Sequence, residues 1–428
     1  MALGGGTFTV QNKKLPGSYI NFVSIARANA SLSDRGYVTM GLELDWGATG
    51  VITITKEDAI KNLKSILGFN YTDDEMADIR DIFKNASVLY LYRLNAGGVK
   101  ASCTYGEAVC AGTRGNDLKI IIETNVDDNT KFDVSTMLGG DLVDAQTVAS
   151  ATELIDNDFV AFDETATLAV TSGTSLTGGT NATVTGTQHT AYLAAIEGYS
   201  FNCIGTKATD ETTIALYTAF TKRLRDDIGS KFQCVVYNTS ADYEGVISTP
   251  NSVNAIPWLV GAEGGCAVNK SCTNKIYDGE ADLSGSVGYT QSQLEAFIDG
   301  GQLAFHKVGD DIRVLTDINT LTTTTEEKGD VFKSNQTIRV IDQIANDIAT
   351  LFNTKYIGTI ANNASGRVSL WSDIVQHHRQ LERIGAIEDF KDSNVVVEQG
   401  DTKRSVYVTD VVEVTNAMEQ LYMTVTIV

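Results

Sequence analysis

The sequence predicts a mixed α/β protein of several domains: an α/β middle layer, an α+β C-terminal assembly domain, an inserted small all-β module and extended terminal arms. Three observations lead to this fold class. The chain has 428 residues, enough for about three domains of ~150 residues each. Short amphipathic helices alternate with apolar strands over much of the chain, which is typical of a layered α/β fold. One long stretch rich in Thr, Ser, Gly and Asn interrupts that alternation.

Residues 1–30 are expected to form an extended arm rather than part of a core. Two strand-like runs, 7–10 and 18–24, are separated by a turn at Pro16-Gly17. An arm of this kind buries little apolar surface by itself. It is therefore expected either to fray or to lie on another element.

The first part of the α/β domain is assigned to residues 31–98 and its second part to residues 191–324. Apolar runs predict strands, and apolar residues three or four apart predict helices. In the first part we expect strands at 36–40, 50–54 and 87–93, and helices at 56–67 and 73–83. In the second part we expect strands at 201–204, 232–237, 302–306 and 312–316, and helices at 210–228, 254–262 and 292–298.

Residues 99–190 are predicted to be an inserted β-rich module. Leu118 to Glu123 alternates in the manner of a strand, and residues 171–187 consist almost entirely of Thr, Ser, Gly and Asn. The module is expected to carry exposed loops.

The C-terminal α+β assembly domain is assigned to residues 325–415. Long amphipathic helices are expected at 338–352 and 370–384, with strands at 395–397 and 405–414. Residues 416–428 follow as a predicted donor strand. Its apolar residues Leu421, Met423, Val425 and Ile427 alternate with mixed ones, as in a strand packed on one face. Such a strand must pair within its own domain or be donated to another chain.

Composition excludes several classes of function. The net charge of −21 argues against a nucleic-acid-binding surface, which needs a basic stripe. No apolar run approaches the ~18 residues of a membrane span, so no membrane insertion is expected. The six cysteines show no C-x-x-C pair and no zinc spacing. With no export signal at Met1, reduced thiols in a cytoplasm are expected.

A search for chemistry yields no catalytic, cofactor-binding or metal-binding residue. Residues 261–265 are glycine-rich, but they lack phosphate-loop spacing and follow a helix. His377 and His378 are adjacent on a helix, point about 100° apart, and are expected to be a solvated or interface pair. Gly309-Asp310-Asp311 is expected to form a turn between strands. A ligand-binding α/β enzyme with a site in 199–265 remains the alternative.

The order and spacing of several motifs resemble the tail sheath proteins of contractile phages and of related contractile particles such as phage-tail-like bacteriocins. The motifs cover most of the chain, whereas residues 120–190 share only the general β-rich character of the corresponding region in that family. They are Pro16-Gly17-Ser18-Tyr19-Ile20, Gly112-Thr113-Arg114-Gly115-Asn116-Asp117-Leu118, Gly301-Gln302-Leu303, Ile318-Asn319-Thr320-Leu321, Ile338-Arg339-Val340-Ile341-Asp342, Gly366-Arg367, Leu381-Glu382-Arg383-Ile384-Gly385-Ala386-Ile387 and Ala417-Met418-Glu419-Gln420-Leu421-Tyr422-Met423-Thr424-Val425.

This resemblance implies a structural, non-enzymatic subunit of a virion or phage-tail-like particle, a contractile injection system assembled in the bacterial host cytoplasm. Subunits of this family form hexameric rings, stacked helically around an inner tail tube protein, with baseplate and tail terminator proteins at the ends. Contraction drives the tube into a target envelope. The terminal arms add strands to sheets of neighbouring subunits.

Carried onto this chain, the resemblance suggests two sets of interaction residues. Intersubunit strand exchange is expected to use Phe8, Val10, Tyr19, Ile20, Phe22, Leu421, Tyr422, Met423, Val425 and Ile427. A helix at 370–384 is expected to face an acidic tube through His377, Arg379 and Arg383, although a solvated helix face would have the same sequence.

Overall fold

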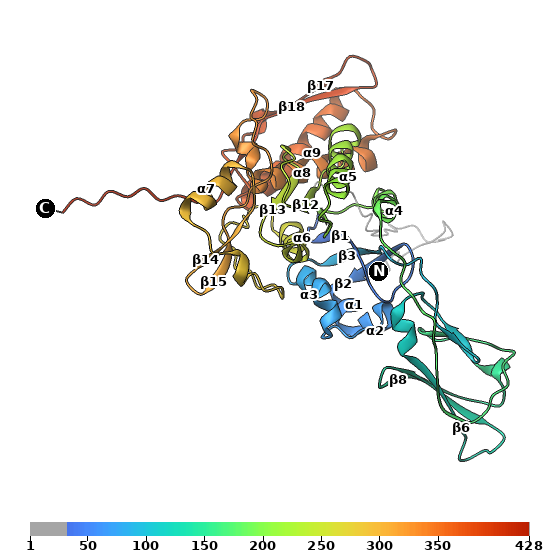
Figure 1. Ribbon diagram of the computed structural model, residues 1–428. Helices are drawn as coiled ribbons and strands as arrows, with labels where there is room; N and C mark the ends of the chain where they lie inside the picture. Colours follow the sequence, from blue (N-terminus) through green and yellow to red (C-terminus); the bar gives the residue numbers. More distant parts are fainter. Residues whose placement is uncertain (1–31, 428) are drawn as a thin grey trace, which may run out of the picture. The chain divides into compact units, whose positions relative to one another are not determined.

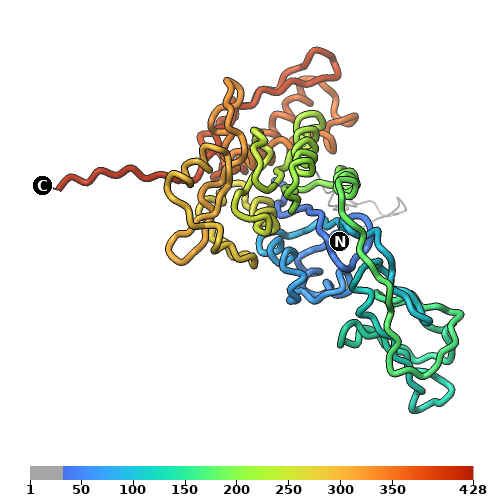
Figure 2. The backbone as a smooth tube through the Cα atoms, in the orientation of Figure 1, coloured from blue at the N-terminus to red at the C-terminus, as the bar shows by residue number. Residues whose placement is uncertain are grey.

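The computed structural model describes residues 32–427 (Figures 1 and 2). These residues form two compact units. The smaller unit comprises Leu32, 347–380 and 391–411; the larger comprises 33–346, 381–390 and 412–427. The two predicted arm strands lie outside the described residues, as do Phe8, Val10, Tyr19, Ile20 and Phe22.

A six-stranded sheet forms the centre of the larger unit, in the order β13-β12-β11-β1-β3-β2. All neighbours are parallel except the edge strand β2, which runs antiparallel to β3. Because parallel strands need crossover connections, this order agrees with the alternation of helices and strands in the sequence. The strands are β1 (Tyr37–Leu42), β2 (Val51–Thr55), β3 (Val88–Arg93), β11 (Cys203–Gly205), β12 (Gln233–Tyr237) and β13 (Val246–Thr249).

Helices cover both faces of this sheet (Figure 1). Successive residues of β12 show the two faces, since Val235 joins one buried cluster while Cys234 and Val236 join another. The first cluster includes residues of α1 (Lys56–Lys61), α2 (Leu63–Leu67), α3 (Ala77–Phe83) and α6 (Ile256–Gly265). The second includes residues of α4 (Gly186–Ile196) and α5 (Glu211–Lys222). The predicted α/β layer is confirmed.

Three helical details differ from the sequence prediction. The helix expected at 56–67 is two helices, because Asn62 leaves the helical conformation at φ −119° and its side chain donates to Asp58 Oδ1. Helix α5 continues as a π-helical segment, Arg223–Ile228, before Gly229 ends it at φ 90°. Helix α4 was not predicted, although Thr185 and Gln188 form the capping box that begins it.

The inserted module is all-β, as predicted. An antiparallel four-stranded sheet has the order β10-β6-β7-β8, and a three-stranded sheet has the order β4-β5-β9. Ile120, Ile122 and Val134 lie in its separate core. The strands are β4 (Ser102–Cys103), β5 (Gly106–Ala108), β6 (Leu118–Thr124), β7 (Phe132–Leu138), β8 (Asp141–Val148), β9 (Val160–Phe162) and β10 (Thr171–Ser175).

The rest of the larger unit contains α7 (Gln291–Asp299) and the hairpin of β14 (Phe305–Val308) and β15 (Asp311–Val314). Gly309, at φ 62°, lies in the turn of that hairpin, as the sequence predicts.

Short 3₁₀ turns occur in both units. They lie at Asp74–Met76, Thr113–Asp117, Ala151–Glu153, Val253–Ala255, Ser284–Ser286, Asp330–Lys333 and Asp392–Asn394.

The C-terminal region contains two long helices and two small antiparallel sheets, which agrees with the predicted α+β class. The helices are α8 (Asn335–Leu351), continued by a π-helical segment at Phe352–Tyr356, and α9 (Ala364–Arg383). In the larger unit β16 (Ile387–Glu388) pairs with β19 (Glu413–Val414). In the smaller unit β17 (Val395–Gln399) pairs with β18 (Val406–Asp410).

Residues 421–427 were predicted to be a donor strand, and in the described chain they do not pair. The segment is extended but has no paired strand within the described chain. The apolar alternation is present without a surface on which to pack.

Candidate assembly surfaces and a buried polar cluster

The C-terminal segment is held at its base and exposed beyond it. The backbone N–H of Ala417 donates to Gln336 Oε1 at 3.0 Å. The carboxylate of Glu419 accepts from Thr273 Oγ1 at 2.6 Å and from Thr316 Oγ1 at 3.0 Å. These three bonds fix where the exposed segment leaves the larger unit.

The C-terminal end of the backbone extends away from the rest of the chain (Figure 2). The apolar side chains beyond Glu419 are exposed to solvent. The exposed fractions are 85% for Leu421, 88% for Tyr422, 74% for Met423, 69% for Val425 and 92% for Ile427. Scattered exposed apolar residues are ordinary, but a contiguous apolar run marks an interaction surface or an aggregation hazard. All five C-terminal residues predicted for strand exchange are therefore available to a partner.

The hairpin of β17 and β18 is the second candidate surface. It is a two-stranded sheet, so each strand has an edge without a partner strand among the described residues. Val396, Tyr407 and Val408 are exposed on it. Within the smaller unit, Trp371 Nε1 donates to Val395 O at 3.0 Å, and this hydrogen bond holds the first residue of β17 against α9. An isolated hairpin is marginally stable, so a braced one with free edges suits the addition of strands.

Helix α9 places the three predicted tube-facing residues differently. Arg379 is exposed and ion-paired with Asp392, at 2.6 Å from Nη2 to Oδ2. Arg383, the last residue of α9, is also exposed. His377 is buried, so it is not part of an outer polar face.

His377 and His378 are also not a solvated pair. Their Nδ1 atoms lie 3.2 Å apart, and each ring has a carboxylate at Nε2. Asp347 lies 2.9 Å from His377 and Asp410 lies 2.7 Å from His378. The carboxylates come from segments 30 and 32 residues away, so local sequence patterns could not predict that the histidines are buried.

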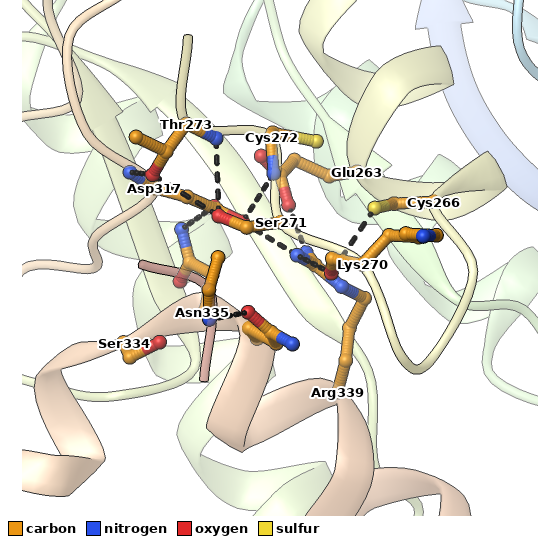
Figure 3. Close-up of polar contacts among 12 residues, drawn as sticks. Glu263, Cys266, Lys270, Ser271, Cys272, Thr273, Asp317, Ser334, Asn335 and Arg339 are labelled. Atoms are coloured by element: carbon orange, nitrogen blue, oxygen red, sulfur yellow. Dashed lines mark hydrogen bonds and ion pairs between the residues drawn. The ribbon is translucent and has the colours of Figure 1, made fainter. Parts of the chain in front are cut away.

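A buried cluster of charged residues surrounds Arg339 of α8 (Figure 3). Its Nη1 donates to Glu263 Oε2 of α6 at 2.5 Å, and its Nη2 donates to Asp317 Oδ2 at 2.5 Å. Nη2 also donates to the backbone oxygen of Lys270 at 3.1 Å. All three charged side chains are at most 1% exposed.

The two carboxylates of this cluster have opposite pKa shifts. Burial opposes ionisation of Asp317, but Arg339, the Cys272 N–H and the Asn335 side chain together lower its pKa. Burial and the charge of Asp317 raise the pKa of Glu263 well above its usual range, although Arg339 opposes the shift. Asp317 accepts several hydrogen bonds, whereas Glu263 Oε1 has none. The proton therefore belongs on Glu263.

Glu263, Cys272 and Asp317 place ligand-type atoms within 4.8 Å of one another, which is close enough to suggest a metal site. Arg339 donates into the same space and already supplies the positive charge. The arrangement is that of an internal ion-pair network rather than of a metal centre.

The glycines of 261–265 serve packing. They lie in α6, where a Cβ on Gly261 would be 2.4 Å from Ile82 O and one on Gly265 would be 2.1 Å from Asn85 O. The missing side chains let α6 approach α3 and the loop after it. This explains the glycine-rich run without a nucleotide.

The segment 199–265 also borders an open cavity of about 650 Å³, which is the location available to an enzyme site. Thr and Ala side chains of α5 and residues 237–241 line most of it. Lys222 is its basic residue, and its Nζ donates to Ala241 O at 3.4 Å. In the described lining no hydroxyl group hydrogen-bonds to Glu211 or Lys222, so the cavity gives the enzyme alternative no support.

Comparison with known families decides the class. Four family models match successive parts of the chain: the phage tail sheath C-terminal domain at 327–428, the phage tail sheath protein central domain at 182–320, the phage tail sheath protein beta-sandwich domain at 96–181, and the tail sheath protein Gp18 domain III N-terminal region at 35–94. The chain belongs to the phage tail sheath family.

Individual relatives agree with this membership. The sheath tail protein of Desulfitobacterium hafniense is 38% identical, with a TM-score of 0.83 over 94% of this chain and 98% of that one. The phage-like element PBSX protein XkdK of Bacillus subtilis is 31% identical over 99% of both chains. The helical sheath of the anti-feeding prophage in its contracted state shares the fold at 13% identity, with a TM-score of 0.56 over 97% of this chain and 99% of that one.

The tail sheath family membership and the mixed multidomain fold are thus confirmed. In the described part of this sheath protein, no helix is both long enough and apolar enough to cross a bilayer. The domain boundaries, the strand-exchange residues and the tube-facing arginines stay predictions.

Proposed function

We propose that this chain is a structural, non-enzymatic subunit of a contractile tail sheath. Copies stack as hexameric rings around an inner tube, and contraction drives the tube through a target cell envelope. Its partners are neighbouring sheath subunits, the tube protein, and baseplate and tail terminator proteins. The particle is a virion or a phage-tail-like relative, assembled in the host cytoplasm. Family membership supports the class of particle.

The observation that carries the proposal is the exposed alternation of Leu421, Met423, Val425 and Ile427. A segment without a partner strand among residues 32–427 can gain main-chain hydrogen bonds from another chain. The alternation fixes the register, because a slip by one residue turns the whole apolar set to the opposite face.

The hairpin of β17 and β18 in a neighbouring copy is the proposed acceptor. Its free edges offer backbone donors and acceptors, and exposed Val396 and Tyr407 offer apolar contact to the incoming side chains. A third strand also turns a marginal hairpin into a more stable sheet. Assembly and local stability are then coupled.

Deletion of residues 421–428 tests the proposal. The truncated protein is expected to remain folded, with an unchanged thermal transition, because those side chains are exposed among the described residues. Electron microscopy is expected to show long sheath polymers for the full chain and none for the truncated one. Normal polymers from the truncated protein would overturn strand donation.

A matched pair of variants tests the face that is buried. Met423→Asp with Val425→Asp places charges on the apolar face, and Thr424→Asp with Thr426→Asp places the same charges on the other face. Only the first pair is expected to abolish polymers. Equal loss from both pairs would argue against a strand packed on one face.

A further inference from the structure

Cys266 and Cys272 lie at the two ends of the short loop beside Arg339 (Figure 3). Cys266 directly follows α6, and its thiol donates to the backbone oxygen of Lys270 at 3.5 Å. The Cys272 thiol donates to Ala262 O at 3.8 Å, and its N–H donates to Asp317 at 2.8 Å. Both thiols therefore lie at the ends of one short loop, next to the C-terminal end of α6.

The surroundings of the two thiols differ. Cys266 is half-buried, whereas Cys272 is buried. The hydrogen bond from Cys272, followed by the charges of Arg339 and Arg35, lowers the pKa of Cys266 to about 6. The same hydrogen bond, burial and the nearby carboxylates raise the pKa of Cys272. Loss of the Cys266 proton thus leaves a half-buried thiolate, whereas Cys272 stays a buried thiol on the same loop.

Three of the other cysteines have raised pKa values. Cys203 and Cys234 are buried, and burial raises the pKa of both. Cys110 is half-buried, and burial raises its pKa also. Oxidants select the accessible thiolate with a second thiol nearby, and this favours Cys266.

We propose that Cys266 and Cys272 form a redox modification site that closes to an intrachain disulfide under peroxide. The Cys266 thiolate attacks one peroxide oxygen, the O–O bond breaks, and the departing hydroxide takes a proton to become water. Cys266 is then a sulfenic acid. The Cys272 sulfur attacks the Cys266 sulfur, the S–O bond breaks, and a second water leaves with the thiol proton. Two thiols lose two electrons, and one peroxide becomes two waters.

The disulfide would join the end of α6 to the segment that positions the buried cluster. Glu263 lies one helical turn before Cys266, and the Lys270 backbone oxygen accepts from Arg339. Cross-linking the loop ends fixes both groups relative to Asp317. The inference concerns this cluster alone and does not depend on the proposed sheath assembly.

Peptide mapping of the full chain tests the site directly. The folded protein is treated with hydrogen peroxide, blocked with an alkylating agent, and digested with trypsin and a glutamate-specific protease. Cleavage after Glu263, Lys270 and Lys275 separates the two cysteines into peptides 264–270 and 271–275. We expect these peptides joined, with two hydrogens lost, and released by dithiothreitol. Recovery of both as alkylated peptides while Cys103 or Cys110 is oxidised would overturn the proposal.

Two variants distinguish the cysteine that reacts with peroxide, Cys266, from the cysteine that closes the disulfide, Cys272. In Cys272→Ser, Cys266 sulfenic acid is expected to accumulate and to be trapped by dimedone, whereas Cys103→Ser is expected to leave the disulfide unchanged. In the wild-type protein the rate of closure is expected to fall about tenfold from pH 7 to pH 5, because the thiolate fraction of Cys266 falls by that factor. A rate that does not change over this range would rule out Cys266 as the attacking thiolate.

Discussion

Arg225 and Asp342 form a two-point ion pair inside the larger unit, with Nη1 2.6 Å from Oδ2 and Nη2 2.8 Å from Oδ1. Their side chains are 4% and 6% exposed. Burial opposes the charge on Arg225, but Asp342 outweighs it and raises the pKa of the guanidinium. The pair links the π-helical end of α5 to α8.

Removing one partner of this pair is expected to be costly. Asp342→Asn leaves a buried guanidinium without its counterion, so we expect a loss of about 3–5 kcal/mol in the free energy of unfolding. The double variant Arg225→Met with Asp342→Leu is expected to recover most of it, since no charge stays buried. Urea unfolding of the three proteins measures this. A double variant as unstable as Asp342→Asn would contradict the ion-pair explanation.

The carboxylates around Arg339 are expected to respond differently to neutralisation. Asp317→Asn removes the charge that balances Arg339, so we expect a loss of about 3 kcal/mol or more. Glu263→Gln replaces a group that is already held in its protonated form, so we expect no loss of stability at pH 7. The two isosteric variants serve as controls for one another in calorimetry at pH 7. Equal losses would show that both carboxylates are ionised in the fold.

The same cluster predicts a pH dependence of stability. The folded-state pKa of Glu263 is raised, so the folded state binds a proton that the unfolded state releases above its pKa of about 4.3. The stability contributed by that proton is complete below about pH 4.3 and falls by at most about 1.4 kcal/mol per pH unit as pH rises toward the folded-state pKa. We therefore measure the unfolding free energies of wild type and Glu263→Gln from pH 5 to 8. The wild-type protein is expected to lose stability relative to the variant as pH rises. Parallel curves would contradict it.

The stability contributed by Asp317 depends on pH in the opposite direction. Its folded-state pKa is lowered, so its contribution is present above about pH 3.9 and is lost as pH falls through the folded value. The deficit of Asp317→Asn relative to wild type is therefore expected to shrink in acid. Unfolding measured from pH 2 to 5 tests this, and a deficit that persists at pH 2 would exclude ionic stabilisation.

Glycine at 261 is expected to be required for the packing of α6. Gly261→Ala introduces a carbon 2.4 Å from Ile82 O, and the backbone must shift, so we expect a loss of roughly 1–3 kcal/mol. Gly186→Ala in the first turn of α4 meets nothing within 4 Å and is expected to be neutral or stabilising. Thermal unfolding of both variants compares packing with helix propensity. A stable Gly261→Ala protein would contradict the close approach.

Local patterns in the sequence were sufficient for the class of the fold. The apolar run at 232–237 could be recognised as a buried strand because both faces of a parallel strand are covered. Helix α4 was missed because its sequence is dominated by Thr, Ala and Gly, and its capping box at Thr185 was the one available sign. Local propensity could not show the interruption at Asn62.

The buried charges could not be predicted, because they pair across the chain. Arg339 and Glu263 are 76 residues apart, and each has the sequence appearance of a solvated helix residue. A signal was nevertheless present in the Ile338 to Asp342 motif, where a charged residue lies beside the apolar stripe of α8. The exposed C-terminal alternation was predictable, because a period of two needs no partner to be recognised.

The exposed arginines at the end of α9 give the last prediction, which concerns the inner tube. Arg379→Glu with Arg383→Glu is expected to impair assembly on purified tubes, because an acidic tube surface would be repelled. Free sheath polymers are expected to persist, since the Arg379–Asp392 pair is exposed and contributes at most about 1 kcal/mol. Lys61→Glu, at an exposed and ion-paired position of α1, is the matched charge reversal. Cosedimentation with tubes and electron microscopy without them separate the two activities. If both were lost equally in the α9 variant and retained in the Lys61 variant, the arginines would belong to contacts between subunits rather than to the tube.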